Sequence, residues 1–185
     1  NYHDPEVLLD VVEVLLAYVA RSASLLRLDA VAYLWKEPGT TCVHLPQTHA
    51  LVRLFRAVLD EVAPHVLLVT ETNVAPEDNV AYFGSGHNEA HLVYNFALPP
   101  LVLHSLRSGN GCALSRWAAD LAPPSDEATF LNFLASHDGV GLNAARGILD
   151  DAQVEALVAA VTASGGLVSY RHTAEGVDEA YELNI

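Results

Sequence analysis

The sequence predicts an α/β fold built around a parallel sheet, and three observations support this prediction. Helical and strand-like segments alternate along the chain, as they do in strand–helix–strand units. The clearest strand-like segment, residues 66–70, is apolar without alternation, which indicates burial on both faces, as in parallel sheets. Finally, acidic residues directly follow three of the apolar runs. Because a (β/α)8 barrel places its chemistry at the C-terminal ends of its strands, this favours a barrel over a doubly wound sheet.

The individual elements are predicted from caps, spacing and breakers. Asp4 can cap a first helix, and Pro5 suits its first position, where the missing N–H has no partner. Apolar residues then recur at helical spacing through residues 8–19. The remaining predicted elements are strands over 25–28, 66–70, 92–96 and 129–135, a helix beginning near Pro46, a helix after Pro100, a last helix that Asp151 can cap, and a hairpin pairing 167–170 with 180–183.

Composition excludes several classes of protein. Hydrophobic residues make up 51% of the sequence, which excludes an intrinsically disordered protein. The net charge of −14 disfavours nucleic-acid and membrane partners. No apolar run approaches the roughly 20 residues that span a bilayer. Cys42 and Cys112 are too few to staple a secreted domain, so we expect reduced thiols and a cytoplasmic location. The sequence contains no methionine, so we expect an excerpt of a longer protein.

Three carboxylates form the candidate active site. Asp29, Glu71 and Asp138 each stand just past an apolar strand, and their spacing fits one strand-to-strand step followed by two. In a parallel arrangement their side chains converge on one rim. Retaining glycosyl transfer requires such a set, because one carboxylate attacks the anomeric carbon while another donates a proton to the leaving oxygen. The alternative is that these acids cap helices or face solvent.

Three segments resemble the α-amylase superfamily, glycoside hydrolase family 13. Residues 26–33 resemble its nucleophile segment, residues 70–73 its acid–base segment, and residues 135–139 the final segment in which His-Asp grips the sugar. The resemblance narrows to the sucrose phosphorylase branch, and particularly to its glucosylglycerate-phosphorylase-like members, through residues 35–42, 79–84 and 93–100. It implies an excerpt of a (β/α)8 TIM barrel, roughly strands 4 to 7 with their helices. Residues 1–185 would then be a partial catalytic domain, with 165–185 a small hairpin insertion after the seventh strand.

The resemblance implies a role for each carboxylate. Asp29 would be the nucleophile that forms a β-glucosyl ester, and Glu71 the general acid and then the base. Asp138 would hold sugar hydroxyls, with His137 beside it. Arg27 lies two residues before Asp29 on the same strand face and could keep the nucleophile ionised. A structural Arg–Asp pair is an alternative that is compatible with this role.

Phosphate and acceptor binding follow from the same resemblance. Tyr33 matches a tyrosine that helps bind phosphate in sucrose phosphorylase. The histidine that follows the acid there is Asn73 here, which can hydrogen-bond phosphate but adds no charge, and this moves the interpretation away from sucrose phosphorylase itself. Lys36 is the candidate cation for a charged acceptor such as glycerate, and a solvated surface lysine is the alternative.

The sequence therefore predicts a retaining α-glucoside phosphorylase with a sugar and inorganic phosphate as substrates and no metal or organic cofactor. The alternatives are a sucrose-type hydrolase or transglucosidase and a non-catalytic sugar-binding remnant. The oligomeric state is left open. Because four strands cannot close an eight-stranded barrel, we expect the isolated chain to be inactive.

Two weaker motifs are set aside. Residues 139–144 fit G-x-G-x-x-A, but no acid follows about 20 residues later to meet a ribose. His87 and His91 have the spacing of a helical zinc pair, yet Gly84 and Gly86 argue against a helix, so we expect ordinary surface or loop histidines.

Overall fold

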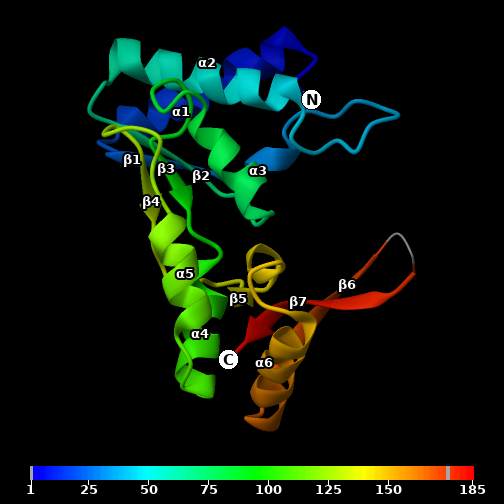
Figure 1. Ribbon diagram of the computed structural model, residues 1–185. Helices are drawn as coiled ribbons and strands as arrows, with labels where there is room; N and C mark the ends of the chain where they lie inside the picture. Colours follow the sequence, from blue (N-terminus) through cyan, green and yellow to red (C-terminus); the bar gives the residue numbers. More distant parts are fainter. Residues whose placement is uncertain (1, 174–175) are drawn as a thin grey trace. The chain divides into compact units, whose positions relative to one another are not determined.

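The structure is a computed structural model that describes residues 2–173 and 176–185 (Figure 1). The chain forms two compact units. The first, here called the sheet unit, consists of Asn1–Thr72, Glu77–Tyr94 and Pro123–Leu131. The second, the hairpin unit, consists of Asn73–Pro76, Asn95–Ala122 and Asn132–Ile185.

The elements follow the predicted alternation of helices and strands. In the sheet unit they are α1 (Pro5–Val19), β1 (Leu25–Leu28), η1 (Val31–Tyr33), α2 (Pro46–Val62), β2 (Leu67–Thr70), α3 (Pro76–Val80), η2 (Ala81–Phe83), β3 (Leu92–Tyr94) and β4 (Thr129–Leu131), with Pro76 at the boundary between the units. In the hairpin unit they are α4 (Leu98–Ser108), α5 (Cys112–Asp120), β5 (Val140–Gly141), η3 (Asn143–Ala145), α6 (Asp151–Ala163), β6 (Leu167–His172) and β7 (Asp178–Asn184).

The sheet unit contains the predicted parallel sheet. Its strand order is β1-β2-β3-β4, and each neighbouring pair is parallel (Figure 1). Strands in sequence order, each separated from the next by helical residues, are what a barrel segment requires. The α/β fold class predicted from the sequence is therefore confirmed.

The strands end earlier than their apolar content suggests. The strand predicted over 92–96 stops at Tyr94, and the one predicted over 129–135 stops at Leu131. Tyr94 and Leu131 are the last pair of the β3–β4 ladder. The predicted strand residues 132–135 lie past this last pair, outside the β3–β4 ladder, and an apolar segment without a partner strand forms no ladder.

One helix start matches the prediction and two differ from it. The α1 cap is confirmed, because Asp4 Oδ1 accepts the Glu6 N–H at 3.0 Å. The cap of α6 is Asp150 and not Asp151, because Gln153 completes a capping box with Asp150. The helix predicted after Pro100 begins at Leu98, so its prolines lie in the first turn, where the missing N–H groups cost no hydrogen bond.

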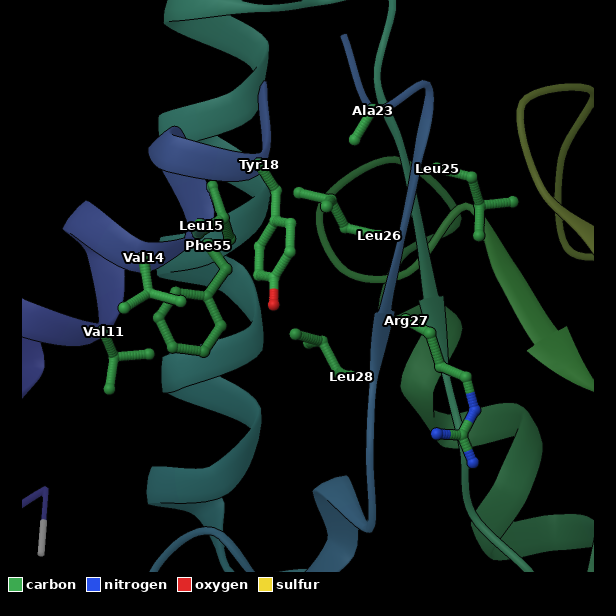
Figure 2. Close-up of a pocket in the computed structure, with 10 residues that line it drawn as sticks. All are labelled: Val11, Val14, Leu15, Tyr18, Ala23, Leu25, Leu26, Arg27, Leu28 and Phe55. Carbon is green, nitrogen blue, oxygen red and sulfur yellow. The ribbon is translucent and has the colours of Figure 1, made fainter. Parts of the chain in front are cut away.

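The core of the sheet unit lies between β1, β2, β3 and the helices α1 and α2. Leu26 and Leu28 of β1 pack against it, while Arg27 points to the other side of the strand (Figure 2). An apolar cavity of about 390 Å³ lies between α1 and β1 on the helix side. The apolar run over 25–28 is only half-buried, because β1 is an edge strand whose described neighbour is β2. The largest fully buried side chains of the core include Phe55, Leu59, Leu68, Tyr82 and Phe83.

The hairpin unit is built on antiparallel strands. β6 pairs with β7 where the sequence predicts a hairpin, with Tyr170 opposite Ala180, and β5 pairs with the other edge of β7. Val154, Leu157 and Val161 of α6 are buried, as their spacing predicts. That this hairpin is an insertion within one catalytic domain of residues 1–185 stays a prediction. Within the ranges that the structure describes, no helix is long and apolar enough to cross a membrane.

His91 corrects the expectation of two surface histidines. His87 is exposed and lies 3.1 Å from Glu127, but His91 is buried, and its Nδ1 accepts the Leu68 N–H at 3.0 Å. Burial lowers the pKa of His91, and the positive charge of Arg56 lowers it further, against the opposing acids around it. A neutral His91 imidazole is therefore part of the folded sheet unit.

We expect acid to destabilise the fold through His91. The unfolded chain takes up this proton near the ordinary histidine pKa of about 6.5, whereas the folded chain does so only at lower pH. The contribution of the neutral His91 to the free energy of unfolding is therefore complete above about pH 6.5 and is lost as the pH falls below that value. His91→Asn retains an acceptor for Leu68 but does not titrate, so its unfolding temperature should fall less than that of the wild type between about pH 8 and 5. An equal fall in both proteins would contradict this account.

Candidate active site

The register of β1 against β2 brings Asp29 and Glu71 together. Leu28 pairs with Thr70 at the ends of these strands, and the next residue on each strand is a carboxylate. The Glu71 N–H donates to the Leu28 carbonyl at 3.0 Å, which extends the ladder one residue further. Two of the three predicted carboxylates therefore stand side by side on one rim of the sheet.

The residue after Asp29 binds Glu71 directly. The Ala30 N–H donates to Glu71 Oε2 at 2.8 Å, and the Val31 N–H donates to the Glu71 carbonyl at 3.3 Å. Ala30 makes its contact from a left-handed conformation with φ 45° and ψ 39°. Such a conformation is unfavourable for a residue with a side chain, and strained residues of this kind cluster at functional sites.

Arg27 contacts both carboxylates. Its Nη1 lies 2.5 Å from Asp29 Oδ1, and its Nη2 lies 4.0 Å from Glu71 Oε2. Partial burial lowers the pKa of Arg27, but the hydrogen bond to Asp29 and the charges of both acids outweigh it, so the pKa is raised overall. The predicted Arg27–Asp29 pair is present, and the arginine also reaches the second acid.

The two carboxylates differ in exposure in a way that suits two roles. The Asp29 side chain is 75% exposed, whereas the Glu71 side chain is 17% exposed and is held by the Ala30 N–H. An accessible anion is suited to attack a bound sugar, and a shielded, oriented carboxyl group is suited to transfer a proton. This geometry is compatible with the nucleophile and acid–base roles predicted from the sequence, which stay predictions.

Lys36 and Tyr33 also lie together. Lys36 Nζ is 5.1 Å from the centroid of the Tyr33 ring, within the range of a cation–π contact. Tyr33 ends η1, four residues after Asp29, and its side chain is exposed. Two of the predicted substrate-binding residues therefore form one exposed pair in the segment that follows Asp29.

His137, Asp138 and Asn73 belong to the hairpin unit. His137 Nε2 lies 3.2 Å from Asp138 Oδ2, and both side chains are exposed. The Asp138 N–H donates to Ser136 Oγ in a tight turn closed by Gly139. Their convergence with the carboxylates of the sheet unit stays a prediction.

Asn73 packs closely against a glycine of its own unit. A Cβ on Gly141 would lie 2.7 Å from Asn73 Nδ2, so the amide occupies space that any larger residue at 141 would fill. Asn73 Oδ1 is buried and has no hydrogen-bond partner among the described residues. An amide oxygen accepts hydrogen bonds and cannot donate them. A hydrogen bond from Asn73 to a phosphate oxygen would therefore have to come from Nδ2.

Sequence reasoning missed three residues at this rim. Ala30 gives no signal, because alanine rarely adopts a positive φ. Tyr94 lies with its ring centroid 5.6 Å from Arg27 Cζ, and Asn79 donates to the Tyr94 carbonyl. The last two lie in segments whose family likeness is visible in the sequence, but their contacts depend on strand register.

No group of three metal-ligating side chains occurs within residues 2–173 and 176–185.

Comparison with known proteins gives two matches that cover all or nearly all of this chain. The chain is 51% identical over 185 residues to glucosylglycerate phosphorylase of Escherichia coli strain K12, covering 100% of this chain and 33% of that enzyme. It is 54% identical to the enzyme of the same name from Allomeiothermus silvanus, covering 99% of this chain and 33% of the relative. A trehalose synthase/amylase of Mycolicibacterium smegmatis is 35% identical over 77% of the chain and 24% of its own length.

The fold comparison agrees with the sequence comparison. The crystal structure of sucrose 6F-phosphate phosphorylase from Thermoanaerobacter thermosaccharolyticum matches with a TM-score of 0.77 at 21% identity, over 93% of this chain and 34% of that one. The chain spans about a third of the length of the two glucosylglycerate phosphorylases and about a quarter of the trehalose synthase/amylase. No protein-family model matches it. In sequence the chain is glucosylglycerate phosphorylase-like, and its fold is part of the (β/α)8 barrel of the sucrose phosphorylase branch of the α-amylase superfamily, glycoside hydrolase family 13.

Proposed function

We propose that the protein containing this chain is a retaining α-glucoside phosphorylase, which transfers a glucosyl group between a glucoside and inorganic phosphate. The observation that carries the proposal is the contact of Arg27 with both Asp29 and Glu71. The chain shares about half of its residues with each of two glucosylglycerate phosphorylases, and this similarity supports the same reaction class.

In the first step, Asp29 attacks the anomeric carbon and the bond to the leaving oxygen breaks. Glu71 gives its proton to that oxygen, so the leaving group departs as a neutral alcohol. Because Glu71 Oε2 already accepts the Ala30 N–H, Oε1 is the oxygen available to carry the proton. Arg27 orients the attacking carboxylate through its contact with Asp29 Oδ1.

In the second step, a phosphate oxygen attacks the anomeric carbon from the face that the leaving group vacated. The ester bond to Asp29 breaks, and Glu71 takes the proton that phosphate gives up. Two inversions give net retention, and the product is α-glucose 1-phosphate. Asp138 and His137 are proposed to hold sugar hydroxyls, on the strength of the family resemblance.

We further propose that Tyr33 and Asn73 contact phosphate and that Lys36 binds an anionic acceptor such as glycerate. A chain with a net charge of −14 repels anions unless local cations offset its field. Lys36 is the only lysine in the sequence, and it lies over the Tyr33 ring. The names of the two half-identical relatives make glycerate the acceptor to test first.

The alternatives have weaker support. A hydrolase or transglucosidase would use the same carboxylates, but the half-identical relatives are named phosphorylases and the trehalose synthases match less of the chain at lower identity. A non-catalytic sugar-binding remnant would not need Arg27 between two acids. A cytoplasmic location is also proposed, supported by the two free cysteines, Cys42 and Cys112.

The carboxylate roles are tested in the full natural polypeptide that contains this chain. With α-glucose 1-phosphate and glycerate, we expect Asp29→Asn to abolish phosphate release, because the nucleophile is lost. Glu71→Gln should lower kcat by about 10²–10⁴-fold for poor leaving groups and far less for glucosyl fluoride, which needs no proton. Glu77→Gln removes an exposed carboxylate of α3 and should behave as the wild type.

Undiminished turnover by Glu71→Gln would remove this residue from the acid role. Release of glucose without any acceptor, at the rate of phosphate release, would replace the phosphorylase with a hydrolase.

The acceptor role of Lys36 has its own test. Lys36→Gln should raise the KM for glycerate by about 10-fold or more, because it removes the charge partner of the carboxylate, whereas Lys36→Arg should preserve most of the affinity. Transfer to the uncharged acceptor glycerol should be unaffected by either change. An equal loss with glycerol and glycerate would show that Lys36 acts on the fold and not on the acceptor.

A further inference from the structure

We propose that Tyr94 is a positioning residue that holds Arg27 between Asp29 and Glu71, and that Asn79 holds Tyr94 in place. The proposal rests on the carboxylate roles given under the proposed function and adds two residues that act through Arg27. Its basis is a set of contacts that joins β1, β3 and α3 across one face of the sheet.

Strand register places Arg27 and Tyr94 on the same face. Arg27 pairs with Val69, and Val69 pairs with Leu92. Tyr94 lies two residues beyond Leu92, so its side chain leaves the sheet on the side that Arg27 occupies. Figure 2 shows that this is the side opposite to Leu26 and Leu28, which pack toward the helices. Arg27 therefore crosses β2 to reach the ring.

The ring limits the freedom of a long side chain. Arg27 Cζ lies 5.6 Å from the centroid of Tyr94, within the range at which an aromatic face attracts a guanidinium. Without such a support, Arg27 would have many rotamers, because its nearer partner, Asp29, is itself largely exposed. Tyr94 thus restricts Arg27 from one direction while the two carboxylates bind it from another.

Asn79 connects the backbone of Tyr94 to the acid–base segment. Its Nδ2 donates to the Tyr94 carbonyl at 2.8 Å, and its Oδ1 accepts the Thr72 hydroxyl at 2.5 Å. Asn79 is only 6% exposed and Thr72 only 2%. Because Thr72 directly follows Glu71, one buried amide connects the segment of the acid to the strand end that carries the ring. Buried amides with both groups satisfied are costly to displace.

The contact matters most in the second step. When Asp29 becomes a glucosyl ester, it loses its negative charge, and with it the strongest attraction on Arg27. The ring of Tyr94 keeps its attraction for the guanidinium in that state, since it does not depend on Asp29. Arg27 is then still in place to stabilise the carboxylate that reforms when phosphate displaces the ester. Loss of the ring should therefore slow the second step more than the first.

The test uses Tyr94→Met and Tyr94→Phe in the full natural polypeptide. Methionine fills much of the volume but has no aromatic face, whereas phenylalanine retains one. We expect Tyr94→Met to lower kcat about 10-fold and also to lower the KM for the glucosyl donor, because the ester accumulates. Tyr94→Phe should stay within about 3-fold of the wild type. Tyr170→Met, at an exposed tyrosine of β6, is the matched control and should leave both constants unchanged.

Folding is checked by thermal unfolding of each variant. Should Tyr94→Met unfold, Asn79→Ser shortens the side chain that bonds the Tyr94 carbonyl and leaves the ring present, and it should lower kcat and KM together. A wild-type kcat in Tyr94→Met, equal losses in the Met and Phe variants, or a raised KM at constant kcat would overturn the inference. Failure of the proposed function is distinct from this: Asp29→Asn would then retain activity, whatever the Tyr94 variants show.

Discussion

The parallel register of β1 on β2 is the constraint on which the candidate site depends. It pairs Leu28 with Thr70, so that Asp29 and Glu71 emerge as neighbours from the same edge of the sheet. It also fixes which face each side chain occupies. A slip of one residue would turn Arg27 toward the helices and place a leucine among the carboxylates. The packing of Leu26 and Leu28 against the core therefore holds Arg27, Asp29 and Glu71 in register.

The distribution of charge gives Arg27 particular weight. The chain has nine lysines and arginines against 23 acids, and several of the arginines are held in other ion pairs. Arg53 contacts the buried Glu89 at 2.8 Å, and Arg171 contacts Glu179 at 2.6 Å. Within so acidic a chain, a cation that contacts two carboxylates lets both stand close together, as the proposed double displacement requires. Lys36 adds a second cation in the same stretch of sequence.

Much of this arrangement could be predicted from the sequence, because the features involved are local. The cap at Asp4, the apolar strands and the acids that follow them are all visible as short patterns. The cap at Asp150 was missed by one residue, although the capping partner Gln153 could have revealed it. Strand ends could not be predicted, because a ladder stops where its neighbour stops and not where apolar residues run out.

Other features depend on tertiary contacts that no pattern encodes. The left-handed Ala30, the burial of His91 and the link from Thr72 through Asn79 to Tyr94 all arise from contacts between different segments of the chain. Asp138, His137 and Asn73 remain predictions drawn from resemblance. The site is thus best supported where register brings residues together, at Arg27, Asp29 and Glu71.

Covalent labelling tests the central claim most directly. A slow fluorinated α-glucosyl donor, added to the full natural polypeptide and quenched before turnover, should leave a glucosyl ester that peptide mass spectrometry locates on Asp29. We expect a label on this residue alone, removed when phosphate is added. A label on another carboxylate, or turnover of the donor with no covalent intermediate, would contradict it.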